Sequence, residues 1–194
     1  MILIIDNYDS ISYNLAQIAG QIKVDVHVKR IDELSVDDIS YMKPSHIIIS
    51  SGSESIHSIG AYERIINEFK DNVPILGVAM AHQIICKVFG NSIRQGKKLM
   101  HGKQGIIHIA NGSKIFLGLP PAIEVARYHS FVLDEKKLTD DFLIIAENED
   151  DEIMAVKHKI YEIYGVQFNP ESILTPQGNL IIKNFLKIGG DIYD

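Results

Sequence analysis

The sequence predicts a single α/β domain that spans residues 1–194. In its first ninety residues, short continuous apolar runs alternate with segments whose apolar residues have helical spacing, which is typical of strands joined by helices. After Gly90 the segments become shorter and alternate between apolar and polar residues, which favours antiparallel strands. The length fits one large domain, and a hydrophobic fraction of 46% is enough to build its core. No internal repeat or linker divides the sequence.

Three buried strands are expected in the first half, because 1–5, 46–50 and 75–78 are short continuous apolar runs. Helical spacing predicts helices between them at 12–22 and 59–69. Residues 24–28 alternate as a less buried strand would, and a short helix is expected after 31–34 and before Pro44. The polar stretch 6–10 follows the first strand at its carboxyl end, where open α/β sheets bind ligands. A second loop is expected at 51–58.

The second half is predicted to consist mainly of strands. Turn signals at 111–112 and 117–121 separate some of them. A closing helix is expected at 179–187. The predicted strands are 105–110, 122–126, 142–146, 153–158 and 160–167.

The chain is organised around residues 75–90. An apolar run behind Pro74 predicts a strand, and the spacing of the apolar residues from Ile84 to Phe89 predicts a helix that stops at Gly90. A strand, a tight turn of small residues and a helix form a nucleophile elbow, which presents one side chain beside amide groups at a helix N-terminus. Such a turn normally carries Cys or Ser at its tip. Here the tip is Ala79.

Residues 77–83 resemble the elbow of class I (triad-type) glutamine amidotransferases, which reads G-x-C-x-G-H-Q. The stretches 165–172 and 126–130 agree with the same family, which has F-H-P-E-S in the first of them. The segments 4–10 and 101–103 narrow the resemblance to the small subunit, component II, of anthranilate synthase or aminodeoxychorismate synthase. The resemblance covers the whole chain in order. It implies a mixed, mostly parallel central sheet with helices on both faces, similar to flavodoxin.

The resemblance places Ala79 at the family's nucleophile, Asn169 at its base and Glu171 at the residue that orients the base. Only Glu171 is retained. An alanine methyl cannot form a thioester, and the amide of Asn169 can hydrogen-bond but cannot exchange a proton near neutral pH. Cys86 lies about 10 Å beyond the elbow along the expected helix and reads as a buried apolar residue. His82 belongs to the family's ordinary pattern. The sequence therefore offers no replacement triad.

The loop that would stabilise an oxyanion also departs from the family, which reads P-G-P-G there, whereas this chain reads Ser51, Gly52, Ser53, Glu54. Glu54 brings a side chain to a place where hydrogen-bond donors are needed. In the elbow, Ala81 replaces the glycine that normally permits the sharp turn. Because nucleophile, base, oxyanion loop and elbow glycine all differ, a natural lineage that has lost glutaminase activity accounts for the sequence better than one engineered substitution.

The resemblance also suggests substrate contacts. Gln83 and the backbone of Ser130 and Phe131 match positions that hold the α-amino and carboxylate groups of glutamine, although Gln83 could equally cap or pair near the helix start. Gly52 is a further expected substrate contact, because a glycine there lets the backbone approach the substrate. Five residues in family motifs would cluster near the site and a subunit interface, and among them His129 could be structural and Lys103 a solvated charge. These residues are His101, Lys103, Arg127, Tyr128 and His129. The eight histidines show no metal-ligand spacing, so neither a metal nor a cofactor is expected.

Composition limits the class of partner. A net charge of −6 argues against nucleic acid. No apolar run approaches the roughly 20 residues that cross a bilayer, and Met1 leads into an apolar run with no basic segment, so no membrane partner and no signal peptide are expected. The single cysteine, Cys86, fits a reducing compartment. These features predict a cytoplasmic protein.

Three functional interpretations follow. In the first, the chain is a degenerate amidotransferase subunit that binds the large subunit of a chorismate-using synthase but does not hydrolyse glutamine. In the second, it is a repurposed small-molecule-binding or regulatory protein on the same fold. In the third, it is an active glutaminase with unusual residues, which the missing sulfur disfavours. The pattern of intact motifs along the whole chain favours the first. The sequence does not decide between an anthranilate and an aminodeoxychorismate partner, or whether glutamine still binds.

Overall fold

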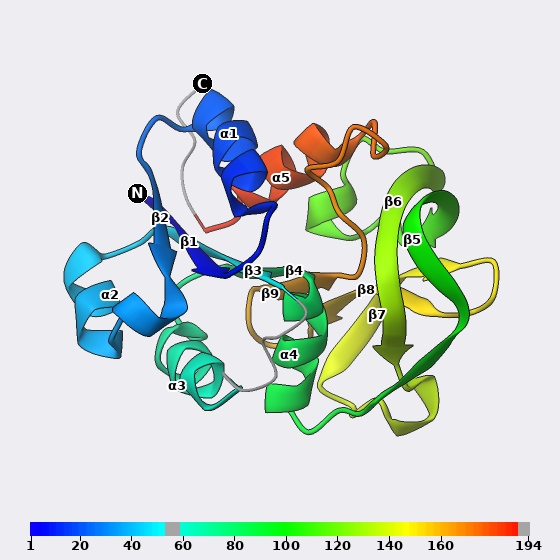
Figure 1. Cartoon of the computed structure of the whole chain (residues 1–194), viewed down its shortest axis with the longest axis horizontal. Helices are drawn as coiled ribbons and strands as arrows, with labels where there is room; N and C mark the ends of the chain where they lie inside the picture. Colours follow the sequence, from blue (N-terminus) through cyan, green and yellow to red (C-terminus); the bar gives the residue numbers. More distant parts are fainter. Residues whose placement is uncertain (53–58, 190–194) are drawn as a thin grey trace.

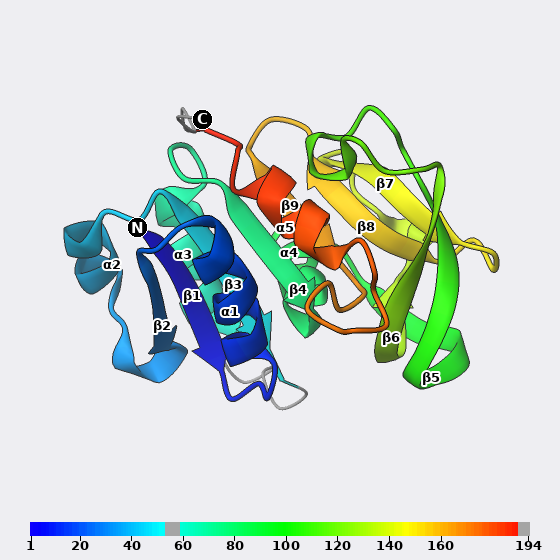
Figure 2. The ribbon, with the colours of Figure 1, turned by 90° about the horizontal axis from the view of Figure 1, so that it is seen from above.

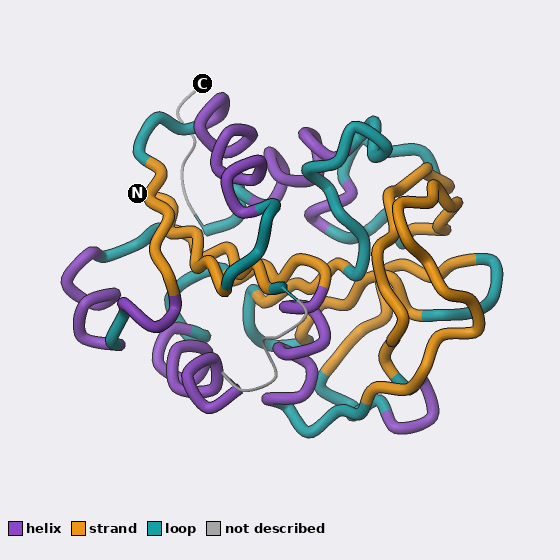
Figure 3. Tube along the Cα trace, viewed as in Figure 1, coloured by secondary structure: helices purple, strands orange, loops and turns teal. Residues whose placement is uncertain are grey.

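The computed structural model describes residues 1–52 and 59–189. Within these ranges the strands form one nine-stranded sheet in the order β2-β1-β3-β4-β9-β8-β7-β5-β6. The strands from β2 to β9 in this order are parallel, and those from β9 to β6 pair antiparallel. Figures 1 and 3 show the sheet running through the molecule, with the long β5–β6 hairpin at one end. The predicted mixed, mostly parallel α/β sheet with an antiparallel extension is confirmed.

The parallel part contains β1 (Ile2–Asn7), β2 (Val26–Arg30), β3 (His46–Ser51), β4 (Ile75–Ala79) and β9 (Ile163–Val166). The antiparallel part contains β5 (Ile93–Ile109), β6 (Ala122–Leu133), β7 (Phe142–Asn148) and β8 (Ile153–His158). The helices are α1 (Ser12–Ile22), α2 (Val36–Met42), α3 (Ile59–Phe69), α4 (Met80–Val88) and α5 (Gly178–Phe185), with short 3-10 turns at η1 (Ile31–Glu33), η3 (Lys114–Phe116) and η4 (Glu135–Lys137).

Alternation along the central strands divides the core into two layers. Ile2 and Ile4 of β1 point to the face covered by α1 and α5, whereas Leu3 and Ile5 point to the face covered by α2, α3 and α4. Figure 2 shows α1 and α5 together on one side of the sheet. Because both faces are covered, the parallel strands are continuous apolar runs, as the sequence predicted. The two layers hold the carboxyl ends of β1, β3, β4 and β9 along one edge.

The β5–β6 hairpin is longer than predicted. The sequence predicted strands at 105–110 and 122–126, but β5 begins at Ile93 and β6 continues to Leu133. Residues 95–104 contain glycines and a polar run, so their sequence does not show the alternation of a regular strand. In the structure, register shifts between Gln95 and Met100 and between His101 and Lys103 interrupt the pairing of this segment with β6. Gly102, with φ of 62°, lies in the second irregularity. The hairpin carries the 126–130 motif to the functional edge of the sheet.

Other boundaries moved by a few residues. The strand predicted at 24–28 is β2, shifted towards Arg30, and Val24 is fully exposed before it. The strand predicted at 160–167 is shorter, because residues 159–162 form a bend. The closing helix predicted at 179–187 is α5, which ends at Phe185. In the described ranges, no helix is long and apolar enough to span a bilayer.

Candidate active site

The turn between β4 and α4 has the geometry predicted for an elbow. Ala79 is the last residue of β4 and the N-cap of α4, with φ of 54° and ψ of −114°. A side chain with a Cβ rarely adopts this backbone, which costs on the order of 1–3 kcal/mol and clusters at functional sites. The alanine therefore occupies a strained turn that aims its methyl group at a cavity. The predicted strand–turn–helix structure is confirmed.

Close packing around Gly77 explains how the turn is made. A Cβ on Gly77 would lie 2.5 Å from Cδ1 of Ile85 and 2.9 Å from the Ala81 carbonyl. The glycine therefore lets α4 double back onto its own strand. Ala81, expected to hinder the turn, lies in the first turn of α4 with its methyl fully buried in the core. The elbow thus forms without the second glycine.

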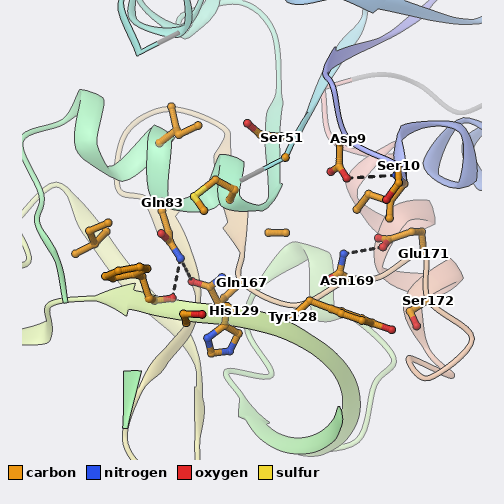
Figure 4. A pocket seen from close by; sticks show the side chains of 18 of the residues that line it. Asp9, Ser10, Ser51, Gln83, Tyr128, His129, Gln167, Asn169, Glu171 and Ser172 are labelled. Atoms are coloured by element: carbon orange, nitrogen blue, oxygen red, sulfur yellow. Dashed lines mark hydrogen bonds between the residues drawn. The ribbon is translucent and has the colours of Figure 1, made fainter. Parts of the chain in front are cut away.

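A cavity of about 850 Å³ opens beside the elbow, at the carboxyl ends of the parallel strands. Its walls come from the segments after β1, β3, β4 and β9 and from β6 of the hairpin. Figure 4 shows two groups of polar side chains in it. We call Asp9, Asn169 and Glu171 the acid end, and Gln83, Gln167 and His129 the amide end. Apolar side chains complete the lining: Ile11, Ile59, Ala79, Met80, Ile84, Ile93 and Phe131.

At the acid end, Asn169 and Glu171 form a pair. Asn169 Nδ2 donates to Glu171 Oε1 at 2.7 Å. Burial raises the pKa of Glu171 to about 7, and the nearby Asp9 carboxylate acts in the same direction, while the Asn169 bond opposes them. Asn169 Oδ1 and Glu171 Oε2 are buried and make no hydrogen bond to described residues. The structure therefore brings Asn169 and Glu171 to the cavity that also receives Ala79.

The loop that carries Asn169 is fixed to the hairpin. Asn169 N–H donates to the Ala126 carbonyl at 3.0 Å, and Thr175 Oγ1 donates to the Asn169 carbonyl at 2.7 Å while accepting from Ala126 N–H. On the other side, a Cβ on Gly178 would overlap the Pro170 carbonyl oxygen. The loop is thus held between β6 and the start of α5.

At the amide end, Gln83 is used to join two elements. Its Nε2 donates to the Phe131 carbonyl and to Gln167 Oε1, both at 2.8 Å. This agrees with the interpretation of Gln83 as a residue that pairs near the start of α4. The hydrogen bond from Gln83 also occupies the backbone oxygen of Phe131. Gln83 Oε1 is buried with no partner among described residues and Gln83 lines the cavity. Gly52, Ser130 and Phe131 line it as well, so all four predicted substrate contacts border one space.

His129 is held by a buried charge network. Arg127 Nε donates to His129 Nε2 at 3.1 Å, and Arg127 Nη2 donates to the fully buried Glu152 at 3.1 Å. Burial lowers the pKa of His129 to about 4, and the Arg127 charge adds to this. Since its Nε2 accepts from Arg127, the neutral ring carries its proton on Nδ1, which is buried without a partner in the described residues. The His129 ring therefore keeps one buried N–H that no described residue accepts.

Glu152 is the centre of this network. It accepts from Lys97 N–H at 2.6 Å and from Asn148 Nδ2 at 2.8 Å. Burial acts to raise the pKa of Glu152, but these bonds and the Arg127 charge together lower it below its ordinary value. The carboxylate thus ties the irregular segment of β5 and the β7–β8 turn to the residues behind His129.

Cys86 and His82, the nearest cysteine and histidine on α4, do not contribute a nucleophile or a base to the cavity. Cys86 is fully buried in the core layer against α3, does not line the cavity, and its thiol pKa is raised by burial. His82 is fully buried against the backbone of Gly165, and burial lowers its pKa to about 3. Neither is positioned to act as a nucleophile or a base on a ligand in the cavity.

The predicted oxyanion loop is described only in part. Gly52 lines the cavity, and its N–H donates to the Asn7 carbonyl at 3.3 Å. A Cβ there would lie 2.9 Å from the Tyr8 carbonyl, so the close approach of the two segments requires glycine. Ser53 and Glu54 lie outside the described residues. Of the 101–103 segment, the His101 backbone pairs with Tyr128 across the hairpin and Lys103 is exposed.

Two cavity residues were not singled out from the sequence. Asp9 accepts from Ser50 Oγ at 2.8 Å and from Ile11 N–H at 3.3 Å, and Gln167 holds Gln83. Both stand inside stretches that were noticed, 4–10 and 165–172. Asp9 follows the strand predicted at 1–5, and Gln167 is the last residue of the strand predicted at 160–167. A polar residue immediately beyond a parallel strand was the available signal.

An α/β fold with a cavity beside a strained strand–turn–helix is the arrangement of enzymes that carry a nucleophile elbow, and of their relatives. The sequence profile of the glutamine amidotransferase class-I family matches residues 3–188. The chain therefore belongs to this family.

The similar proteins include synthase subunits. The aminodeoxychorismate synthase component 2 of Klebsiella aerogenes is 42% identical over 187 residues, covering 96% of this chain and 99% of that protein. The anthranilate synthase component 2 of Pseudomonas aeruginosa is 40% identical over 197 residues, covering 99% and 98%. The chain also matches about a third, 32%, of the bifunctional protein TrpGD of Thermotoga maritima, at 41% identity over 96% of this chain.

A solved structure supports the fold independently. The crystal structure of a Thermoplasma acidophilum protein, described as one of the subunits of GMP synthase, has a TM-score of 0.88 and 26% identity, covering 97% of this chain and 92% of that one. The similarity extends over both the parallel and the antiparallel parts of the sheet.

Proposed function

We propose that this chain is a small subunit of the anthranilate or aminodeoxychorismate synthase type that has lost glutamine hydrolysis and acts as a single partner-binding unit. The relatives that carry the component 2 names match it over nearly their whole length. That extent supports retention of a subunit role better than retention of the fold alone.

The observation that carries the proposal is the methyl group of Ala79 at the tip of the elbow. The strained backbone is kept, with φ of 54°, although the residue there has no nucleophilic atom. Asn169, on a loop that borders the same cavity, donates a hydrogen bond from its Nδ2 to Glu171, and its side-chain amide cannot act as a base. Covalent amide hydrolysis by the family's route requires both a thiolate and a base, so the geometry supports binding and not turnover.

The partner would be the large subunit of a chorismate-using synthase. The mouth of the cavity carries exposed apolar side chains, Tyr128 at 49% and Phe131 at 46%. Together with the elbow and the 101–103 segment they would form a permanent interface that buries well over roughly 1,200 Å² in total. In that complex the partner would use free ammonia, and this chain would contribute stability or shape.

The alternative is a repurposed small-molecule-binding or regulatory protein. The size of the cavity favours this alternative as far as a ligand is concerned. The two functions imply different binding partners, so an experiment that identifies the partner distinguishes them.

Affinity purification of the full chain from its native host, followed by mass spectrometry, tests the proposal. Recovery of a chorismate-using synthase subunit in stoichiometric amount is the expected result. Repeated isolation of the chain alone, or with an unrelated protein, would overturn the subunit role. Disruption of the complex by Phe131→Glu, with the exposed and distant Tyr41→Glu as control, would place the interface at the cavity mouth.

A further inference from the structure

A turn far from the cavity residues carries a reactive sequence. Asn111 and Gly112 connect β5 to the η3 turn, are both exposed, and do not line the cavity. Ser113 N–H donates to the Ala110 carbonyl at 3.0 Å, so the pair occupies the two central positions of a β-turn. In an asparagine that precedes glycine, the next backbone nitrogen can attack the side-chain carbonyl carbon. The turn at 111–112 therefore has a chemical property as well as a structural one.

The backbone around Gly112 leaves this nitrogen accessible. Gly112 N–H makes no hydrogen bond to a described residue, and a Cβ built on Gly112 would meet nothing within 4 Å. The φ angle of Gly112 is not positive, so the turn does not need glycine for its conformation. The side chain of Asn111 also makes no hydrogen bond within the described part of the chain. Neither the attacking nitrogen nor the attacked amide is held away from the other by a contact.

Other asparagines lack this combination, since Asn111 is the only one in the sequence that glycine follows. Asn72 is the most similar, because it too lies in an exposed turn. Its next residue, however, is the β-branched Val73, whose N–H donates to the Phe69 carbonyl at 2.9 Å. Asn72 is therefore an internal reference for an exposed asparagine whose following nitrogen is shielded.

We propose that Asn111 is a site of spontaneous deamidation and isomerisation, with water as the co-reactant. The backbone nitrogen of Gly112 loses its proton to hydroxide and bonds to Cγ of Asn111, which closes a succinimide ring. The bond from Cγ to Nδ2 breaks, and the side-chain nitrogen leaves as ammonia with a proton from water. Water then adds to one of the two ring carbonyl carbons, and the ring opens to aspartate or to isoaspartate. The reaction requires neither glutamine nor a partner, so the inference does not rest on the proposed function.

Isoaspartate at this turn would disturb the core that follows it. In isoaspartate the main chain runs through the side-chain carbon, which adds one carbon atom to the backbone of the turn. Directly after the turn, Ile115 and Phe116 are buried. Asn184 Nδ2, on α5, donates to the carbonyls of Ile115 and Leu117 at 3.2 and 2.8 Å. Because these contacts fix η3 against α5, the longer turn should lower the stability of the fold.

Incubation of the purified full chain in neutral and in mildly alkaline buffer, followed by peptide mass spectrometry, tests this. The peptide that contains Asn111 should show the mass change of an amide converted to an acid, with an isoaspartate fraction that an isoaspartyl methyltransferase modifies. It should convert at least about three-fold faster than the peptide that contains Asn72, since the backbone freedom of glycine alone corresponds to a factor of about two to five. The rate should rise with pH, because the attacking nitrogen must lose its proton.

Gly112→Ala is the decisive variant, because the open space around Gly112 accepts a methyl group while the added Cβ hinders the attack. It should slow conversion of Asn111 by at least about three-fold. Gly20→Ala, also in open space, is the matched control and should leave the rate unchanged. Equal rates in the two variants, or conversion of Asn111 no faster than that of Asn72 in the unmodified chain, would overturn the inference.

Urea denaturation of fresh and aged samples tests the effect on the core. Aged wild-type protein should unfold at a lower urea concentration than fresh protein, whereas aged Gly112→Ala should not. Isoaspartate at Asn111 without loss of stability would overturn the link to η3 and α5. Ammonia from this reaction cannot exceed one molecule per chain and forms without glutamine, so it is distinguishable from the glutaminase turnover that would overturn the proposed function.

Discussion

At position 79, a methyl group occupies the place where the strained turn between β4 and α4 presents its side chain to the cavity. Around it, Asn169 and Glu171 keep the contact that would orient a base, although an amide now stands in the base position that the family resemblance assigns. The backbone has the geometry of an elbow, but neither residue 79 nor residue 169 carries a nucleophile or a base. A variant that places a cysteine at position 79 and a histidine at position 169 tests whether other residues also limit the activity.

The double variant Ala79→Cys with Asn169→His should recover little glutaminase activity. Glu54 still differs from the family's oxyanion loop, and the loss of one oxyanion donor alone reduces turnover by about 10²–10³-fold. Glutamate release by the purified variant should stay below about a hundredth of that of an active relative assayed in parallel. Recovery to a comparable rate would show that the oxyanion loop matters less than the sequence suggests.

Glu171 should make the stability of the fold depend on pH. Because its pKa in the folded chain is raised from 4.5 to about 7, the folded state binds the proton more strongly, and the stabilisation present below pH 4.5 is lost as the pH rises through 7. Relative to the wild type, Glu171→Gln should gain roughly 2–3 kcal/mol in unfolding free energy between pH 5 and pH 8. Urea denaturation at both pH values measures this; a constant difference would contradict the raised pKa.

At the scale of elements, the loop 167–175 is positioned by β6 and by the start of α5, not by its own sequence. Gly178 is the point of closest approach, since a Cβ there would overlap the Pro170 carbonyl oxygen. The α5 helix therefore begins where it does because only glycine fits beside that carbonyl.

Gly178→Ala should destabilise the fold by about 2–3 kcal/mol through overpacking against the backbone. Gly20→Ala is the matched control, because Gly20 lies inside α1 with nothing within 4 Å of a Cβ, and it should stabilise by about 0.5–1 kcal/mol. Thermal and chemical denaturation of both variants measure the two changes in unfolding free energy. Equal effects of the two substitutions would refute the account of the loop.

The same scale shows what the sequence could predict. The parallel strands, α1, α3, the elbow and α4 followed directly from apolar runs and helical spacing, because local pattern and tertiary burial agree there. The first half of β5 was missed, since its glycines and lysines satisfy a strand only through long-range pairing with β6. Likewise, the contact between Arg127 and Glu152 joins residues 25 apart in the sequence and leaves no local pattern. The buried network that holds His129 could therefore not be predicted from the sequence.

Among the described residues four histidines are buried, and the three with the largest pKa shifts should set the acid limit of the fold. Burial lowers the pKa of His82 to about 3 and of His46 and His129 to about 4. Each therefore contributes stability that is present above pH 6.5 and is lost as the pH falls towards 4. Together these losses are comparable with the 5–15 kcal/mol that stabilises a typical domain.

The chain should therefore unfold between pH 6 and pH 4, as followed by circular dichroism. His46→Gln should reduce the pH dependence of the unfolding free energy, because it removes one buried titrating ring. His108→Gln, on an exposed position of β5, should leave it unchanged. A protein that stays folded at pH 3.5 would contradict these buried neutral histidines.

We expect no glutaminase activity from a chain that carries an alanine at the elbow of a complete family fold. The most direct test measures glutamate release from glutamine by the purified full chain, alone and with its copurified synthase partner, while the partner's product is followed with free ammonia. We expect no glutamate above background in either case, and product formation with ammonia. Dose-dependent glutamate release that persists through further purification would contradict it.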